Sequence, residues 1–340
     1  MSTRRAGLVV LATATLPPRW TAAAPAPTAA PTAALTAAPA PRPSSPWPNK
    51  PIRLLVGFPG GSTPDLAARV LADALGQAWG VAVVVDNRPG AAGNIAADQV
   101  AKATDDHTLG VVVNGNLTVA RLLNPKLPFD PARDFSLLSL LATAPLVLVA
   151  AGNVPGGAAF FAAARQAAGD WNYGSVGIGS VGHLGMELLK GRNGFTAVHV
   201  PYSGNPAVLT ALMAGQIQAA LVPPGVAMPQ VRAGKLQAIG LTGGRSTLAP
   251  DVAPLASLGV AGDGLEVWVA LVGPAGLSAA AQQRLAVDVP ALLRAPGARQ
   301  RLFAAGWQVQ ASSAEALRLS VLAETRILGG IIRQRGIRAD

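Results

Sequence analysis

Short apolar runs alternate with longer amphipathic segments along the first half of the chain. Buried strands are predicted at 52–57, 81–86 and 109–113, because each apolar run is short and is bounded by turn residues. Between them, residues 66–75 and 94–101 have the apolar spacing of helices that cover a sheet. Strands that alternate with helices in this way predict a parallel sheet with helices on its faces.

The second half continues this alternation with different residues and ends in helices. Strands are predicted at 146–150, 171–173, 196–200, 217–222, 236–241 and 267–272, and helices at 158–167, 182–190, 279–293, 297–305 and 314–332. Two α/β units followed by terminal helices predict an α/β protein of two lobes. A ligand of such a fold lies outside the carboxyl ends of the strands, so two facing lobes would enclose a ligand cleft.

The N-terminal 46 residues differ in composition from the rest of the chain. Arg4 and Arg5 precede a short apolar stretch at 7–16, which is the layout of a signal peptide, and the Ser-Thr-Arg-Arg run also resembles twin-arginine signals. We interpret residues 1–20 as a signal peptide and 21–46, which are almost entirely Ala, Pro and Thr, as a flexible linker. The alternative is a disordered basic tail.

Composition and charge exclude several classes of protein. The chain has no cysteine, which excludes disulfides, thiolate metal sites and cysteine nucleophiles. Its net charge is +10, but the basic residues are scattered apart from a C-terminal group that we interpret as a solvated helix face, and aromatic residues make up only 4%. We therefore expect no nucleic-acid partner. The apolar run at 137–151 contains Pro145 and is shorter than the ~20 residues that cross a bilayer.

The loop at 59–65 reads Pro-Gly-Gly-Ser-Thr-Pro-Asp and joins a predicted strand to a predicted helix. Its glycines let the backbone approach a ligand closely. Thr63 is the expected helix cap, with Pro64 at the first helical position and Asp65 in the first turn. The free N–H groups of such a helix start attract anions, although the loop could also serve only to begin the helix. It is not a P-loop, because the final Gly-Lys-Ser/Thr is missing.

A second loop of similar type lies at 173–183 and reads Tyr-Gly-Ser-Val-Gly-Ile-Gly-Ser-Val-Gly-His. It also leads into a predicted helix, with Ser180 as the expected cap. The G-x-G-x-x-G that begins at Gly177 resembles a dinucleotide motif, which requires an acidic residue ~20 positions later. No Asp or Glu occurs between Glu187 and Asp251, so we do not expect a dinucleotide cofactor.

An enzyme that uses the Gly/Ser loop at 174–183 remains the alternative to a binding protein. A hydrolase would pair Ser175 or Ser180 with His183, but the nucleophile motif G-x-S-x-G has Ile178 where it needs glycine. We interpret His183 as a packed or capping residue that can pair with Glu187, one helical turn away. The histidines of the chain follow no metal-ligand spacing, so no metal is expected.

Several motifs occur in an order that resembles a known family of receptors. They are Trp47-Pro-Asn-Lys-Pro-Ile-Arg-Leu-Leu-Val-Gly-Phe-Pro-Gly-Gly with Asp65 and Arg69, Val85-Asp-Asn-Arg-Pro-Gly-Ala-Ala-Gly-Asn-Ile, Leu127-Pro-Phe-Asp-Pro, the loop at 173–183 with Glu187, His199-Val-Pro-Tyr-Ser-Gly, Gly234-Lys-Leu and Gly273-Pro-Ala-Gly. Together they resemble the tripartite tricarboxylate transporter substrate-binding receptors, also called the Bug family, from residue 47 to the C-terminus.

The resemblance implies a two-lobed periplasmic binding protein fold (type II-like) with crossing strands and a ligand cleft. Lobe I would comprise 47–147 with 269–340, and lobe II 148–268. It further implies a monomeric periplasmic receptor without cofactor or catalysis, which delivers a small carboxylate to membrane transporter subunits. A receptor that signals instead is an open alternative.

The same resemblance suggests which residues hold the ligand, namely those of the two loops together with positions along the cleft. The expected ligand-binding residues are Phe58, Gly60, Gly61, Ser62, Thr63, Asp65, Asn114, Ser175, Gly179, Ser180, His183, Tyr202 and Pro223. The chain departs from the family at 218–224, where many members carry an acidic residue, and at 114–118. The identity of the carboxylate therefore stays open.

Overall fold

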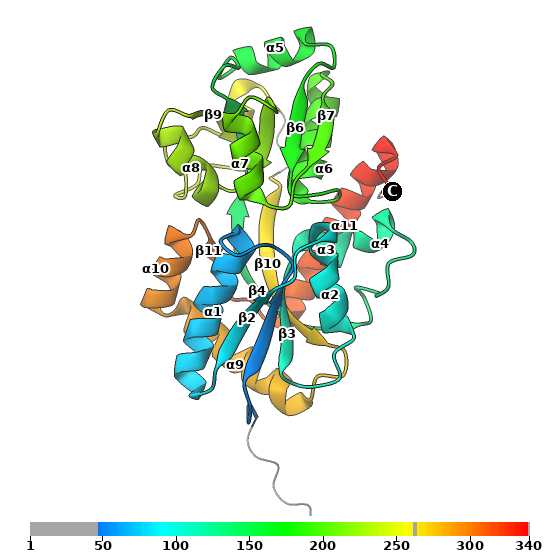
Figure 1. Cartoon of the computed structure of the whole chain (residues 1–340), viewed down its shortest axis with the longest axis vertical. Coiled ribbons are helices and arrows are strands. Elements are labelled where there is room, and N and C mark those ends of the chain that lie inside the picture. The colour runs from blue at the N-terminus through cyan, green and yellow to red at the C-terminus, as the bar shows by residue number, and fades with distance from the viewer. Residues whose placement is uncertain (1–46, 261–263, 339–340) are drawn as a thin grey trace, which may run out of the picture. The chain divides into compact units, whose positions relative to one another are not determined.

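The structure is a computed structural model that describes residues 47–260 and 264–338 (Figure 1). The predicted signal peptide at 1–20 and linker at 21–46 lie outside the described residues. All described residues belong to one unit of the chain, residues 45–340. In this part of the chain no helix combines the length and the apolar character needed to cross a membrane.

A six-stranded sheet forms the first lobe, with the strand order β11-β4-β10-β3-β1-β2. Its strands are β1 (Ile52–Val56), β2 (Val83–Asn87), β3 (Thr108–Val113), β4 (Phe135–Pro145), β10 (Glu266–Pro274) and β11 (Gln308–Val309). Strand β1 pairs in parallel with β2 and β3, whereas β10 is antiparallel to β3 and β4. Side chains of consecutive residues leave a strand on opposite faces, so Leu54 and Leu55 enter different cores.

Helices cover both faces of this sheet. They are α1 (Thr63–Trp79), α9 (Ala279–Arg294) and α10 (Pro296–Ala304) on one face, and α2 (Asn94–Ala101), α3 (Asn114–Thr118) and α11 (Ala314–Arg335) on the other. A short helix, α4 (Ala120–Leu123), follows α3. Buried leucines such as Leu71 of α1 and Leu285 of α9 fill the core on the first face.

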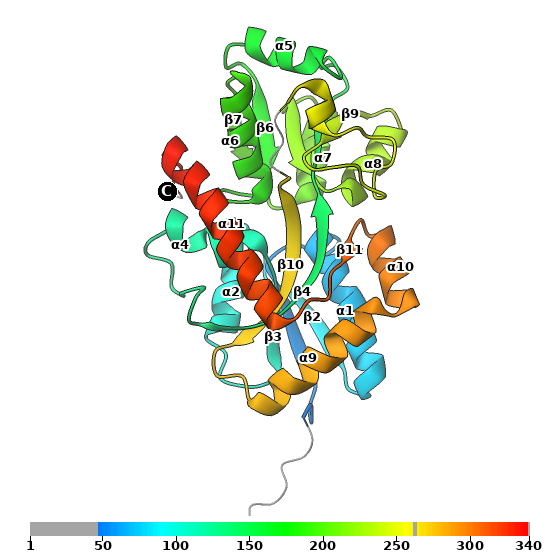
Figure 2. The ribbon, with the colours of Figure 1, turned by 180° about the vertical axis from the view of Figure 1, so that it is seen from behind.

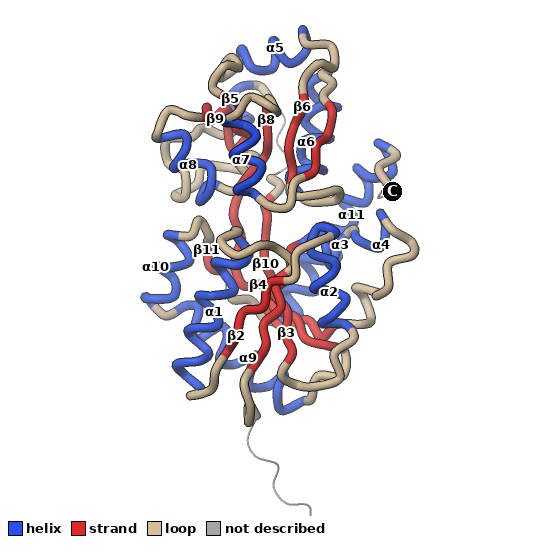
Figure 3. The backbone as a smooth tube through the Cα atoms, in the orientation of Figure 1, coloured by secondary structure: helices blue, strands red, loops and turns tan. Residues whose placement is uncertain are grey.

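A five-stranded sheet with the order β7-β6-β8-β5-β9 forms the second lobe (Figure 3). Its strands are β5 (Val147–Ala151), β6 (Asn172–Ser175), β7 (Val198–Pro201), β8 (Ala219–Val222) and β9 (Leu236–Leu241). The helices are α5 (Ala159–Gln166) and α6 (Val181–Asn193) on one face, and α7 (Asn205–Met213) and α8 (Pro224–Arg232) on the other. Strand β5 runs antiparallel to β8 and β9, and β6 runs parallel to β7 and β8.

The chain passes between the lobes at two crossing strands and along the last helix. Strand β4 ends at Pro145 and β5 begins at Val147, so one extended segment serves both sheets (Figures 1 and 2). Helix α11 buries Leu317 in the core of the first lobe and Leu328 and Ile332 in that of the second (Figure 2). The predicted two-lobed α/β fold is confirmed.

The predicted parallel pairing is confirmed for β1 with β2 and β3, and β6 pairs in parallel with β7 and β8. Strands β10 and β5, which arrive from the other lobe, enter each sheet in the opposite direction and make both sheets mixed. Strand β4 was anticipated only as an apolar run, and helices α7 and α8 were not anticipated at all. Both helices carry proline in their first turn, and α8 contains Pro229 as well, so their apolar spacing gives a weak helical signal. The lobe limits given above stay a prediction.

Candidate functional site

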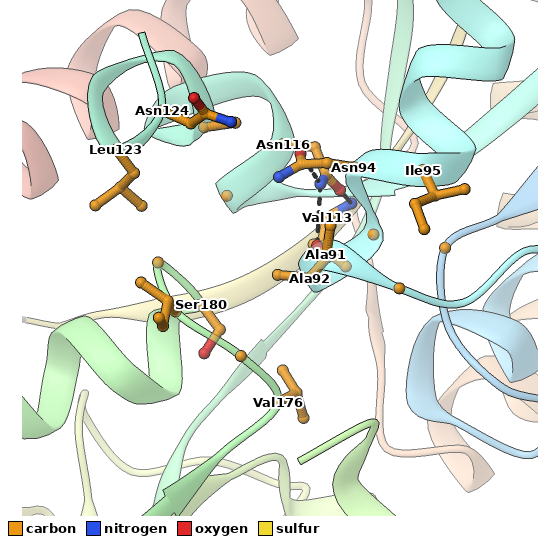
Figure 4. A pocket seen from close by; sticks show the side chains of 18 of the residues that line it. Ala91, Ala92, Asn94, Ile95, Val113, Asn116, Leu123, Asn124, Val176 and Ser180 are labelled. Atoms are coloured by element: carbon orange, nitrogen blue, oxygen red, sulfur yellow. Dashed lines mark hydrogen bonds between the residues drawn. The ribbon is translucent and has the colours of Figure 1, made fainter. Parts of the chain in front are cut away.

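A cavity of about 1050 Å³ lies where the carboxyl ends of strands from both sheets face each other. The first lobe contributes residues at and after the ends of β1, β2 and β3, and the second contributes 176–180 and 201–203, at and after the ends of β6 and β7. This is the position that the alternation of strands and helices predicts for a ligand. Figure 4 shows Val176 and Ser180 of the second lobe opposite Ala92 and Asn116 of the first.

A smaller chamber of about 50 Å³ lies next to the large cavity, at the crossing strands. Leu146, which joins β4 to β5, and Val267 of β10 are among its walls. Phe58 and Ser180 line both spaces. We call the small space the inner chamber and the large one the outer cavity.

Helix starts gather around the inner chamber. In the described part of the chain, four helices of eight or more residues begin at its walls, namely α1, α6, α7 and α8. The first N–H groups of a helix lack partners inside the helix and together carry about half a positive charge. An anionic group in the chamber would therefore meet positive potential from both lobes, although no charged side chain is among its lining residues.

Two serine hydroxyls at these helix starts are available to a ligand. Ser62 is the N-cap residue of α1 and is only 2% exposed, yet its Oγ has no hydrogen-bond partner among the described residues. Ser180 is the N-cap residue of α6, and its Oγ accepts the backbone N–H of His183 at 3.3 Å. The capping role predicted for Ser180 is confirmed, and this geometry leaves its hydroxyl proton available for donation.

Thr63 is not the cap of its helix, so that expectation was wrong. The helix begins one residue earlier than expected, which places Ser62 at the cap and Pro64 in the second helical position. The Thr63 Oγ1 instead accepts a hydrogen bond from Nδ2 of Asn205, across the cleft, at 3.2 Å. Asn205 was not predicted as a site residue, although an Asn-Pro pair favours the start of a turn.

Asp65 lies behind the first loop and holds it in shape. Its carboxylate accepts hydrogen bonds from the Gly61 N–H at 2.8 Å, from Arg69 Nε at 2.9 Å and from Asn87 Nδ2 at 2.9 Å. Burial raises the pKa of Asp65, but the bonds from Arg69, Asn87 and Gly61 outweigh it and hold this pKa below its usual value. The carboxylate therefore stays charged and anchors the loop to the end of β2.

The histidines near the second loop form a buried stack. The rings of His183 and His199 are stacked with their centroids 4.0 Å apart, and the ring of Tyr173 lies against both. Nδ1 of His183 accepts the N–H of Gly179 at 3.1 Å, which fixes the loop from behind. Burial lowers the pKa of His183 to about 4 and that of His199 to about 3, so both rings are neutral at neutral pH.

The serines of the second loop are not arranged for hydrolysis. Oγ of Ser175 lies 2.7 Å from Nε2 of His199, rather than near His183, and it also bonds the backbone of Gly177. Among the described residues, no carboxylate hydrogen-bonds to the His199 ring to orient it as a base. The hydroxyl of Ser180 bonds only the backbone N–H of His183, so neither Ser–His pair of the hydrolase alternative forms.

Asn114 joins the cleft to a buried carboxyl group that was not anticipated from the sequence. Its Nδ2 donates to Glu324 Oε1 at 2.7 Å and to the backbone oxygen of Glu266 at 3.1 Å. Nε1 of Trp268 donates to the other oxygen of Glu324. Burial raises the pKa of Glu324 to about 7, against these two hydrogen bonds.

The predicted ligand-binding residues separate into two groups. Those that line a cavity are Phe58, Ser62, Thr63, Asn114, Gly179, Ser180, Tyr202 and Pro223. Those that line neither the inner chamber nor the outer cavity are Gly60, Gly61, Asp65, Ser175 and His183. In the described part of the chain, no group of three or more His, Cys, Asp or Glu side chains could hold a metal ion.

Comparison with known proteins gives the family. Residues 67–337 match the family described as "Tripartite tricarboxylate transporter family receptor". A UPF0065 protein of Bordetella pertussis is 34% identical over 70% of this chain and 75% of its own length. The protein BugT of the same organism is 33% identical over 70% of this chain and 74% of its own.

Solved structures agree with this family. An R. palustris protein determined with adipate has a TM-score of 0.82 and 29% identity, covering 86% of this chain and 99% of that one. MatC from Rhodopseudomonas palustris, determined with bound malate, has a TM-score of 0.78 and 28% identity, covering 84% of this chain and 100% of that one. The chain therefore belongs to the family of tripartite tricarboxylate transporter receptors, as its motifs predicted.

Proposed function

We propose that the protein is an extracytoplasmic solute receptor that binds a small carboxylate between its lobes. It would act in the periplasm and deliver the ligand to membrane subunits of a tripartite tricarboxylate-type transporter. Membership of the receptor family supports this function, and so do similar proteins solved with adipate and with malate. In this proposal the protein is a monomer that has no cofactor and no catalytic activity.

The observation that carries the proposal is the unpartnered hydroxyl of Ser62 in a chamber surrounded by helix starts. A buried hydroxyl without a partner costs about 1–3 kcal/mol, so such a group indicates a missing partner. A ligand carboxylate would accept hydrogen bonds from the Ser62 and Ser180 hydroxyl groups of opposite lobes. The chamber of about 50 Å³ has room for a carboxylate or another small group, while the rest of the ligand would extend into the outer cavity.

Closure of the lobes fits the same function. Gly115 and Gly179 approach so closely across the cleft that a Cβ on Gly115 would lie 3.1 Å from the Gly179 oxygen. A ligand that contacts both lobes must bind this closed state more tightly than an open one. Binding would therefore shift the protein toward closure.

Titration calorimetry with hexanoate and with its neutral amide, hexanamide, tests the proposal. A carboxylate held by charge-assisted hydrogen bonds gains about 1.5–3 kcal/mol for each such bond, so hexanoate should bind at least tenfold more tightly. Equal affinity for acid and amide would show that the site does not recognise a carboxylate. Release of product from hexanoate esters at a rate above that of buffer would favour the hydrolase alternative.

A further inference from the structure

The outer cavity differs in chemistry from the inner chamber. Its volume of about 1050 Å³ is at the upper end of pockets that hold drug-sized molecules, and it far exceeds what a four-carbon acid occupies. Apolar side chains from both lobes line it, including Ile95, Val119 and Leu123 from the first lobe and Val176 and Ile178 from the second. In Figure 4, Leu123 and Val176 lie on opposite sides of this space.

Charged groups are scarce along this wall. Among its described lining residues, the only charged side chains are Asp98 and Lys126. The Asp98 carboxylate forms an ion pair with Lys102 at 2.7 Å. Lys126 is exposed in the loop after α4, where hydration of its ammonium group weakens any ion pair with a ligand.

The most buried amide of the wall, that of Asn116, is already bonded within the protein. Nδ2 of Asn116 donates to the Ala92 oxygen at 3.1 Å and to Asn94 Oδ1 at 2.8 Å, and its Oδ1 accepts the Val113 N–H. Both amide hydrogens of Asn116 are therefore used. A second carboxylate beside Asn116 would lose water without gaining a buried cation, and neither amide hydrogen of Asn116 is free to bond it, which is unfavourable.

From these observations we propose that the natural ligand is a monocarboxylate with a bulky apolar body, rather than a dicarboxylate. This proposal rests on the proposed function, because it places the single carboxylate in the inner chamber. The apolar body occupies the outer cavity, where Leu123 and Ile178 determine which shapes fit. Burial of that body supplies affinity in proportion to the apolar area that leaves water.

Calorimetry with three acids tests the proposal on the full-length mature protein. Hexanoate and adipate have the same six-carbon chain and differ in the second carboxylate, while 4-phenylbutyrate adds an aromatic ring. We expect 4-phenylbutyrate to bind most tightly and adipate at least tenfold more weakly than hexanoate. Adipate that binds as tightly as hexanoate, or more tightly, would overturn the proposal while leaving the carboxylate receptor intact. Equal binding of hexanoate and hexanamide would instead overturn the proposed function.

Two variants sharpen the result. Lys126→Met should change the affinities for hexanoate and adipate by less than twofold, because this exposed lysine at the edge of the outer cavity takes no part in binding. Ile178→Lys places a cation in the outer cavity and should reverse the preference, so that adipate binds more tightly than hexanoate. A tenfold loss of adipate affinity in Lys126→Met, with the affinity for hexanoate unchanged, would show that Lys126 binds a second carboxylate. That result would contradict the proposal.

Discussion

Asn205 and Thr63 are 142 residues apart in sequence and are joined by a hydrogen bond across the cleft. Each residue lies at the start of a helix, one in each lobe, and both line the inner chamber. The bond from Asn205 Nδ2 to Thr63 Oγ1 therefore holds the lobes together directly beside the place proposed for the carboxylate.

The first prediction concerns this bond. Asn205→Ala should shift the protein toward an open state, because it removes a bond worth about 0.5–1.5 kcal/mol that forms only when the lobes meet. Affinity for hexanoate should fall roughly two- to tenfold. Solution scattering should show a larger radius of gyration without ligand and closure at saturation. Unchanged scattering and affinity would show that the bond does not bias closure.

Thr63→Val alters the other end of the same hydrogen bond and is compared with Asn205→Ala. It removes the acceptor while nearly preserving the volume of the side chain. If the two residues act through one bond, the double variant should lose no more affinity than either single variant. Additive losses would mean that each residue contacts the ligand separately.

The second prediction separates binding from stability at Ser62. Ser62→Ala should weaken hexanoate binding roughly ten- to a hundredfold, because it removes a charge-assisted hydrogen bond. The free protein should melt at the same or a higher temperature, because the lost hydroxyl was buried without a partner. Calorimetry and thermal unfolding measure the two effects. A lower melting temperature with unchanged affinity would mean that the hydroxyl serves the fold.

Ser180→Ala should affect both quantities, which is the third prediction. The hydroxyl caps α6, so its loss should lower the free energy of unfolding by about 0.5–2 kcal/mol. The affinity for hexanoate should also fall roughly ten- to a hundredfold if the hydroxyl donates a hydrogen bond to the carboxylate. Losses in Ser62→Ala and Ser180→Ala should not add, because both hydroxyls would hold one group. Ser257→Ala, at an exposed hydroxyl that lines neither cavity, serves as the control.

The fourth prediction concerns pH and the stacked histidines. In the unfolded chain each histidine has a pKa near 6.5, whereas burial lowers the pKa of His183 to about 4 and that of His199 to about 3. The two histidines bind more protons in the unfolded state, whereas Glu324, with its pKa raised to about 7, binds more in the folded state and offsets about one of them. The free energy of unfolding should therefore still fall as pH decreases from about 6.5 toward 4. Urea unfolding at a series of pH values measures this slope.

His199→Gln provides the control for that slope. Glutamine can still bond the Ser175 hydroxyl but does not titrate in this range. Because Glu324 opposes the histidines in this range, the variant should lose most of the pH dependence between pH 6.5 and 4. A slope equal to that of the unaltered protein would assign the effect to other groups.

Much of the fold could be predicted because its signals are local. The runs that became β1 and β3 are short and apolar, and the glycine-rich loops mark where helices begin. Strand β4 was missed because an apolar segment that crosses from one lobe to the other has no turn at its middle. The antiparallel pairing of β10 with β3 depends on residues more than a hundred positions apart, which periodicity does not report.

The site could be predicted only to the level of its loops. The cap at Ser180 follows from local spacing, and it was confirmed. The partner of Ser175 is His199, which the sequence did not indicate, because strand β7 pairs beside β6 and brings that ring to the loop. Likewise, Asn205 reaches the cleft, and the carboxyl of Glu324 reaches Asn114 behind it, only through tertiary packing, so no spacing in the sequence predicts them.

The position of a bound carboxylate tests the central claim most directly. In a crystal structure of the protein with 4-phenylbutyrate, we predict that the carboxylate lies in the inner chamber within about 2.5–3.2 Å of the Ser62 hydroxyl oxygen. The phenyl ring should lie in the outer cavity between Leu123 and Ile178. A carboxylate bound at Lys126, with the phenyl ring in the inner chamber, would contradict the account.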